Sequence, residues 1–152
     1  MVSIEVKRSS INGNIRCPSS KSYTHRAVAI ASLAKDRSTI TNPLLARDTL
    51  ATISSCKALG AEIRHEGESL YIRGKTSFDP PDTVLNAENS GTTIRIMSAM
   101  ASLVSDGFTV LTGDESLRKR PMQPIIDALS QLGVRCYSTR TNGMAPLLVC
   151  GG

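Results

Sequence analysis

The pattern of apolar and polar residues predicts the same series of elements twice along the chain. In each half, an apolar helix is followed by a short strand, a second helix that ends in Leu-Gly, and two more short strands. The glycine of each Leu-Gly pair provides a left-handed helix stop. The helices are predicted at 27–34, 48–59, 94–104 and 121–132, and the strands at 38–41, 61–65, 70–73, 108–111, 134–137 and 147–149.

Each half therefore reads as a β-α-β-α-β-β unit, and the repeat predicts an α/β (α+β) fold with mixed sheets. The first helix of each unit is apolar nearly all round, so we expect buried helices with the sheets outside them. A doubly wound Rossmann domain is the alternative. It requires long apolar parallel strands and a glycine fingerprint directly after a strand, and the sequence contains neither.

Residues 76–82, Thr-Ser-Phe-Asp-Pro-Pro-Asp, form the clearest break in the pattern, because two successive prolines end regular structure. We expect the first unit to span 18–78 and the second 79–152. Residues 9–14 read as a turn between two short strands, so residues 1–17 are predicted to form an N-terminal hairpin ahead of the first unit.

The composition is that of a globular chain with a basic character. Of the 152 residues, 40% are apolar and 20% charged, and the net charge is +5. This charge suits nucleic acid, a membrane surface or acidic metabolites. Only 3% of the residues are aromatic and tryptophan is absent, which leaves few rings to stack on bases. Acidic metabolites are therefore favoured, and no nucleic-acid partner is expected.

Neither a metal, a cofactor nor a membrane is predicted. The four cysteines have no C-x-x-C spacing and only two histidines accompany them. No segment approaches the ~18 apolar residues of a membrane span, and the N-terminal residues lack a signal or transit pattern. We therefore expect reduced thiols and a cytoplasmic location.

Basic, hydroxyl-rich helix starts occur about seventy residues apart, at Ser20-Lys21-Ser22 with Arg26, and at Asn89-Ser90-Gly91-Thr92 with Arg95. A helix N-terminus presents unpaired N–H groups and the positive end of the macrodipole, and an arginine one turn inside adds charge at the same place. Each start is a candidate phosphate or carboxylate site. The alternative is an ordinary capped helix with solvated basic side chains.

A third candidate is Arg120, which lies just before the helix predicted to begin at Pro121 and is expected to face an anion there. The neighbouring Arg118 and Lys119 are expected to be solvated. Both histidines, His25 and His65, are predicted to lie on the surface. The acidic residues of the loops are interpreted as caps or loop carboxylates: Asp48, Asp114 and Glu115.

Three motifs together resemble the family of 5-enolpyruvylshikimate-3-phosphate (EPSP) synthases, over nearly the whole chain. They agree with the family in order and spacing: Ser20-Lys21-Ser22 with Arg26, Asn89 with Gly91-Thr92 and Arg95, and Arg120-Pro121. The resemblance implies part of an inverse α/β barrel of the enolpyruvyl-transferase type. It also implies transfer of the enolpyruvyl group of phosphoenolpyruvate to the 5-hydroxyl of shikimate 3-phosphate.

The resemblance implies roles for individual residues. Lys21 would be catalytic and lie between the two substrates, while Ser22 and Arg26 would hold shikimate 3-phosphate with it. Phosphoenolpyruvate would be bound by Lys21, Asn89, Gly91, Thr92, Arg95 and Arg120.

The chain departs from the family in length. Members have two domains of three units each, so the third unit and the second domain, with its catalytic Asp and Glu, are expected to lie outside these 152 residues. The resemblance assigns the N-terminal hairpin to that second domain and implies a monomeric full-length enzyme. We expect no turnover by this chain alone. Ile96 also replaces a proline that many members have.

Two alternatives remain open. UDP-N-acetylglucosamine enolpyruvyl transferase shares fold and chemistry, but it usually has Asn after the lysine and Cys five residues before the Arg-Pro pair. Ser22 and Glu115 occupy those positions here and favour the EPSP synthases. The basic charge also allows a non-catalytic phosphate-binding or nucleic-acid-binding module.

Overall fold

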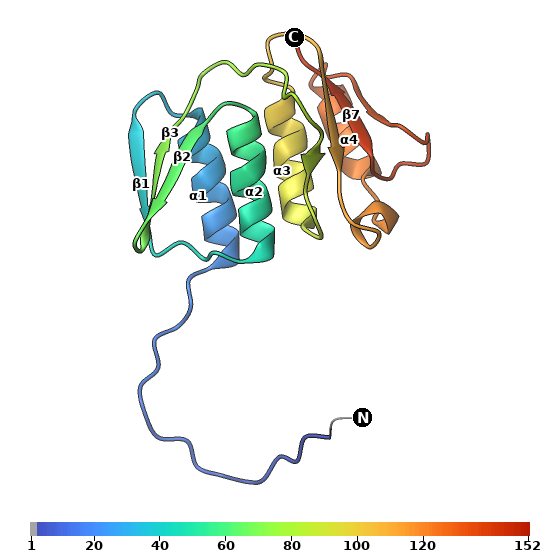
Figure 1. Ribbon diagram of the computed structural model, residues 1–152. Helices are drawn as coiled ribbons and strands as arrows, with labels where there is room; N and C mark the ends of the chain where they lie inside the picture. The colour runs from blue at the N-terminus through green and yellow to red at the C-terminus, as the bar shows by residue number, and fades with distance from the viewer. Residues whose placement is uncertain (1–2) are drawn as a thin grey trace.

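The computed structural model describes residues 3–152. Its elements form two sheets and a group of helices (Figure 1). In chain order they are α1 (Lys21–Leu33), β1 (Arg37–Thr41), α2 (Arg47–Ala58), β2 (Glu62–Glu66), β3 (Ser69–Arg73), β4 (Leu85–Asn86), α3 (Gly91–Ala101), β5 (Phe108–Thr112), the 3₁₀ turn Leu117–Lys119, α4 (Gln123–Gln131), β6 (Cys136–Ser138) and β7 (Leu147–Cys150).

Each half of the chain contributes its own sheet. The first is antiparallel with strand order β1-β3-β2, and the second has the order β4-β5-β7-β6. Strand β4 pairs in parallel with β5, through Leu85 and Leu111, whereas the other pairs of both sheets are antiparallel. The mixed sheets predicted from the repeat are therefore present.

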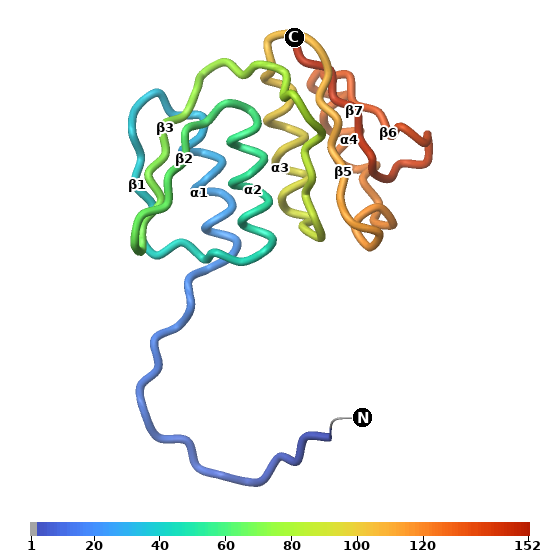
Figure 2. Tube along the Cα trace, viewed as in Figure 1, coloured from blue at the N-terminus to red at the C-terminus, as the bar shows by residue number. Residues whose placement is uncertain are grey.

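The helices α1, α2 and α3 stand side by side between the two sheets (Figures 1 and 2). Their facing sides and the inner faces of the sheets form one apolar core, which includes Val28, Cys56, Ile72, Met97 and Leu147. Burial of such side chains contributes the main favourable free energy of folding. The core therefore joins the two halves.

The predicted helix stops are confirmed. Gly60 follows α2 with φ +98° and Gly133 follows α4 with φ +86°, a region that residues with a Cβ rarely adopt. Both glycines come directly after a leucine, Leu59 and Leu132. These two leucines, though equivalent in sequence, differ sharply in burial: Leu59 is 1% exposed and Leu132 is 80% exposed.

The predicted N-terminal hairpin is wrong for the described part of the segment. Residues 3–20 contain no strand (residues 1 and 2 lie outside the described residues), so α1 is not preceded by a strand as α3 is by β4. The apolar side chains of this segment, such as Ile11 at 98% and Ile15 at 89% exposure, contact no sheet. A two-stranded hairpin without a sheet or helix to pack against is only marginally stable in water.

The expectation that α1 is buried on all sides is also wrong. Val28 and Ala29 face the core, but Tyr23 is 76% and Ile30 is 68% exposed. In the described chain α2 covers one side of α1, and no element lies over the side that carries Tyr23 and Ile30. The division into units at 78/79 stays a prediction.

None of the helices described between residues 3 and 152 is long and apolar enough to cross a membrane.

Candidate functional site

Helices α1, α2 and α3 begin at the same end of the molecule and run in the same direction (Figures 1 and 2). Ser20 and Ser90 cap α1 and α3, because their hydroxyl oxygens accept hydrogen bonds from Tyr23 N and Thr93 N. Helix α2 begins after Ala46, which has no polar side chain to occupy its first N–H groups. Three positive helix ends therefore meet on one side of the molecule.

Lys21, the first residue of α1, is held by an acidic residue of α2. Its Nζ lies 2.8 Å from Asp48 Oδ2, and the two side chains are 52% and 27% exposed. Asp48 is the second residue of α2 rather than a cap or a loop carboxylate as interpreted from the sequence, and its pairing with Lys21 was not predicted. Ser22 and Arg26 lie on the exposed side of α1. The ion pair leaves the ammonium group open to solvent and to an incoming anion.

Two arginines cover the start of α3. Arg95 Nη1 donates a hydrogen bond of 2.9 Å to Gly91 O, and Arg120 Nη2 donates to Asn89 Oδ1. A Cβ at Gly91 would lie 2.8 Å from Arg95 Nη1 and 3.3 Å from Arg120 Nη1. The absence of a side chain at this position is what lets both guanidinium groups approach the backbone. Thr92 lies beside them and is exposed.

The position of Arg120 differs from the sequence prediction. Helix α4 begins at Gln123 rather than Pro121, and Pro121 forms a bridge with Met144. The side chain of Arg120 extends to the start of α3 instead of the start of α4. That Arg120 belongs to an anion site stays a prediction. The helix start that it faces is that of α3, because its side chain extends to Asn89.

Asp114 fixes the orientation of the Asn89 amide. Asn89 Nδ2 donates a hydrogen bond of 2.8 Å to Asp114 Oδ2, so its oxygen is left to accept from Arg120. Asp114 Oδ1 also accepts a hydrogen bond of 2.8 Å from the backbone N–H of Leu117, the first residue of the 3₁₀ turn. The hydrogen bond from Leu117 N, followed by that from Asn89, lowers the pKa of Asp114. The carboxylate therefore remains ionised and keeps Asn89 and Arg120 in place.

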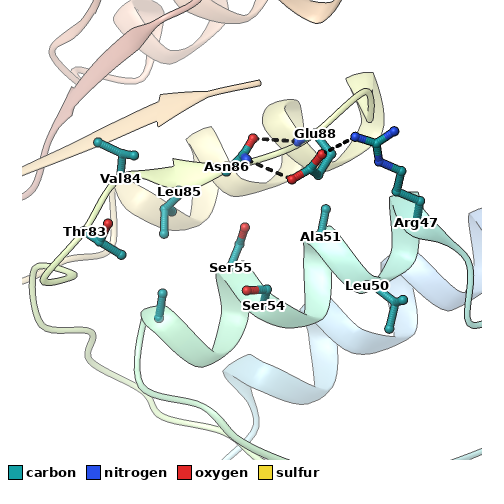
Figure 3. A pocket seen from close by; sticks show the side chains of 11 residues that line it. Arg47, Leu50, Ala51, Ser54, Ser55, Thr83, Val84, Leu85, Asn86 and Glu88 are labelled. Carbon is teal, nitrogen blue, oxygen red and sulfur yellow. Dashed lines mark hydrogen bonds and ion pairs between the residues drawn. The ribbon is translucent and has the colours of Figure 1, made fainter. Parts of the chain in front are cut away.

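A second ion pair joins the starts of α2 and α3. Arg47 Nη2 lies 2.6 Å from Glu88 Oε2, and the hydrogen bond to Glu88 raises the pKa of Arg47. Asn86 Nδ2 donates a hydrogen bond of 2.8 Å to the other carboxylate oxygen of Glu88 (Figure 3). Glu88 has φ +52°, a left-handed conformation that turns the chain immediately before Asn89.

The Arg47–Glu88 pair closes one end of a groove of about 510 Å³ between α2 and β4. Its lining is mostly small or apolar, with Leu50, Ala51 and Leu85 among its residues (Figure 3). None of the residues predicted to bind substrate lines it, in the part of the chain that the structure describes. The groove therefore lies beside the cluster of basic helix starts rather than on it.

His25 is not a surface residue as predicted, since it is 1% exposed. It lies one turn after Lys21 on α1, and its Nδ1 is 2.7 Å from Thr52 Oγ1 of α2. Burial lowers its pKa, the charge of Asp48 raises it, and the charge of Lys21 lowers it further. His65 is exposed as expected. The sequence carried no signal for the burial of His25, because α2 covers that face of α1.

The structure thus groups the predicted residues into two neighbouring clusters. Lys21 lies with Asp48, whereas Asn89, Gly91, Arg95 and Arg120 surround the start of α3. Asp48 belongs to both clusters, because its backbone oxygen accepts a hydrogen bond of 3.1 Å from Thr93 Oγ1. Sequence reasoning missed Arg47, Asp48 and Glu88 as parts of this end of the molecule. The Arg47-Asp48 pair at a predicted helix start was the available signal.

Comparison with known proteins places this arrangement in a family. The family model for EPSP synthase (3-phosphoshikimate 1-carboxyvinyltransferase) matches residues 6–152. A 3-phosphoshikimate 1-carboxyvinyltransferase of Nitrosopumilus maritimus is 52% identical over 147 residues, which are 97% of this chain and 34% of that protein. One from Methanococcus maripaludis strain C7 is 51% identical over 146 residues, 96% of this chain and 34% of the relative.

The solved structures agree. EPSP synthase from Acinetobacter baumannii superimposes with a TM-score of 0.85 at 31% sequence identity, covering 92% of this chain and 32% of that structure. The chain spans about a third of the length of the relatives it matches. The family model, the relatives and the matching fold lead to one conclusion: the chain belongs to the EPSP synthase family.

Proposed function

We propose that the chain is the part of an EPSP synthase that holds the anionic groups of shikimate 3-phosphate and phosphoenolpyruvate. The complete enzyme would transfer the enolpyruvyl group of phosphoenolpyruvate to the 5-hydroxyl of shikimate 3-phosphate and release phosphate. One observation carries the proposal. Three helix starts converge on a single side of the molecule, and Lys21, Arg95 and Arg120 gather there.

Lys21, Ser22 and Arg26 would bind shikimate 3-phosphate at the start of α1. Ser22 offers a hydroxyl donor, and Arg26 lies one turn further along the same exposed side. Both side chains meet solvent, so a phosphate needs to displace only water. The carboxylate of Asp48 would then share Lys21 with the substrate. An exposed ion pair of this kind is worth about 0–1 kcal/mol, so the anion can displace it readily.

Phosphoenolpyruvate would bind at the start of α3. Lys21 would face it from α1, while Gly91 gives the ligand access to the backbone. Asn89 and Asp114 keep the Arg120 guanidinium oriented. The full set of side chains proposed for this substrate is Lys21, Asn89, Gly91, Thr92, Arg95 and Arg120.

The reaction suits a strongly cationic site. The enol methylene takes up a proton, the 5-hydroxyl oxygen bonds to C2 and loses its proton, and phosphate leaves as the methyl group returns a proton and the double bond forms again. Negative charge grows on the departing phosphate, which preorganised ammonium and guanidinium groups stabilise. Lys21 is placed to move protons and to balance that charge.

Calorimetric titration tests the binding part of the proposal. We expect shikimate 3-phosphate to bind, Lys21→Ala and Arg26→Ala to weaken its binding about tenfold or more, and a short oligonucleotide not to compete. Lys35→Ala and Arg37→Ala, exposed residues at the other end of α1 and in β1, are matched controls with unchanged affinity. Equal effects of all four substitutions, or competition by the oligonucleotide, would contradict the proposal. Turnover by the chain alone would contradict the proposal that this chain binds the anionic groups while the transfer needs the complete enzyme.

A further inference from the structure

A buried chain of four polar side chains joins the N-terminal halves of α1, α2 and α3. His25 Nδ1 lies 2.7 Å from Thr52 Oγ1, and Thr52 Oγ1 lies 2.7 Å from Thr93 Oγ1. Thr93 Oγ1 lies 2.7 Å from Ser90 Oγ and 3.1 Å from Asp48 O. The four side chains are at most 2% exposed. Water therefore does not compete for these hydrogen bonds.

The donor is not the same in every reading of these bonds. Thr93 Oγ1 donates either to Ser90 Oγ or to Asp48 O, which can only accept. Either hydroxyl can donate between Thr52 and Thr93, and the direction between His25 and Thr52 depends on the ring tautomer. We expect the ring proton on Nδ1, donated to Thr52, because the buried Nε2 has no partner among the described residues to receive a proton.

Stability alone does not account for this arrangement. His25 Nε2 is buried and has no hydrogen-bond partner among the described residues, and an unsatisfied buried atom opposes folding. Replacing both partners of a buried hydrogen bond by apolar side chains of the same shape can leave the stability of a protein nearly unchanged or raise it. Apolar contacts are not directional, whereas the four hydrogen bonds fix the distances between the three helices.

These distances matter at the candidate site. Lys21 lies one turn before His25 on α1, and Ser90 is the cap of α3 immediately before Gly91. Asp48 is held by Thr93 through its backbone and holds Lys21 through its carboxylate. The charged groups that act on His25 are Asp48 and Lys21. The network therefore lies next to both proposed substrate positions, at the start of α1 and at the start of α3.

We propose that His25 is a positioning residue that holds the start of α1 at a set spacing from the start of α3, through Thr52 and Thr93. The inference rests on the proposed function, because the spacing matters only if both helix starts engage substrates together. His25 touches neither substrate. Its effect is to let shikimate 3-phosphate at α1 and phosphoenolpyruvate at α3 bind at the same time.

Three threonine variants separate positioning from packing. Thr52→Val keeps the shape of the side chain and removes the hydroxyl, and Thr52→Ser keeps the hydroxyl and removes a methyl group. Thr109→Val is the matched control, since Thr109 is 1% exposed and its hydroxyl has no partner among residues 3–152. Thermal unfolding of each variant shows whether the fold is intact.

Two measurements follow on these variants. Nitrogen-15 NMR of the imidazole ring reports the tautomer, and we expect the Nδ1–H form in the unmodified chain and a loss of this preference in Thr52→Val. Titration with phosphoenolpyruvate in the presence of shikimate 3-phosphate reports the spacing. We expect Thr52→Val to weaken binding about tenfold, Thr52→Ser to restore it, and Thr109→Val to leave it unchanged.

The outcomes separate the two proposals. If the unmodified chain binds both ligands and Thr52→Val binds them equally well, the positioning role is wrong and the proposed function stands. An unchanged ring tautomer in Thr52→Val likewise shows that Thr52 does not hold the imidazole, and it overturns the positioning role. If the unmodified chain binds neither ligand, the proposed function fails and the inference fails with it.

Discussion

The two halves of the chain have almost the same order of elements but very different surroundings. Counted from the caps Ser20 and Ser90, Ile30 of α1 corresponds to Met100 of α3, yet the first is 68% exposed and the second 4%. Leu59 and Leu132, which follow the second helix of each half, differ in the opposite sense: Leu59 of the first half is buried and Leu132 of the second half is exposed. Helix α2 lies against α3, and no described element covers the matching side of α1. Whether a residue is buried therefore depends on whether a neighbouring unit covers it, and not on the local sequence pattern.

The sheets differ in the same way. In the second half β4 adds a parallel strand beside β5, whereas β1, the counterpart of β5, has a free edge. The segment that would correspond to β4 contains Ile15, which is 89% exposed. An equivalent sequence therefore forms a strand in one half and remains extended and solvated in the other.

The largest difference between the halves is expected at the paired leucines. Leu59→Ala should lower the free energy of unfolding by about 2–5 kcal/mol, because it leaves a cavity in the core. Leu132→Ala should change it by less than about 0.5 kcal/mol. Urea denaturation of both variants checks the comparison. Similar losses in the two would show that Leu132 is covered in solution.

The two helix caps should differ next. Ser90 is 2% exposed and bonds both Thr93 N and Thr93 Oγ1, whereas Ser20 is exposed and bonds Tyr23 N. We expect Ser90→Ala to destabilise by about 2 kcal/mol and Ser20→Ala by about 0.5–1 kcal/mol. Thermal unfolding measures both. A larger loss for Ser20→Ala would contradict the comparison.

Lys21 and Gly91 are the first residues of α1 and α3. Substitution of Gly91 is expected to change substrate binding rather than the stability of the fold. In Gly91→Ala the new Cβ would meet Arg95 Nη1 at 2.8 Å and Arg120 Nη1 at 3.3 Å, so the flexible guanidinium groups must shift. We expect phosphoenolpyruvate binding to weaken about tenfold while the fold keeps its stability, since alanine favours a helix by about 0.5–1 kcal/mol. Titration and thermal unfolding together test this. Unchanged binding would remove Gly91 from the site.

A smaller difference concerns pH. Burial lowers the pKa of His25 below its ordinary value of 6.5, so the unfolded chain takes up a proton more readily than the folded chain. The free energy of unfolding should therefore fall as the pH drops below 6.5 toward the lowered pKa. Arg95 occupies the equivalent place in the second half, counted from the caps Ser20 and Ser90.

His25→Asn should reduce this pH dependence. Denaturation at about pH 7.5 and about pH 5.5 gives the change for each protein. The asparagine amide can still donate to Thr52, so the variant should fold. An equal fall in the variant and the unmodified chain would assign the effect to other groups.

Much of the fold was predictable because the determinants are local. The strand and helix patterns from residue 27 onward and the Leu-Gly stops each depend on a few neighbouring residues, and the structure contains these elements. The residues at the basic helix starts were also recognisable, because charge beside Ser, Gly and Thr marks an anion site before any packing is known.

What the sequence did not reveal depends on contacts between distant segments. The burial of His25, the reach of Arg120 to Asn89 and the Lys21–Asp48 pair each join residues more than twenty positions apart or depend on α2 covering α1. The wrong hairpin and the exposed side of α1 have the same origin. An apolar pattern predicts that a residue is suited to burial, but not that a partner is present.

We propose that the helix starts of the two halves together form one binding site for two anionic substrates. Amide nitrogen–proton NMR of the chain during titration, first with shikimate 3-phosphate and then with phosphoenolpyruvate, tests it most directly. We expect shifts at Lys21 and Ser22 in the first step and at Gly91 and Thr92 in the second. Shifts that instead spread over the first sheet, at the exposed Arg64 and Arg73, would contradict the proposed site.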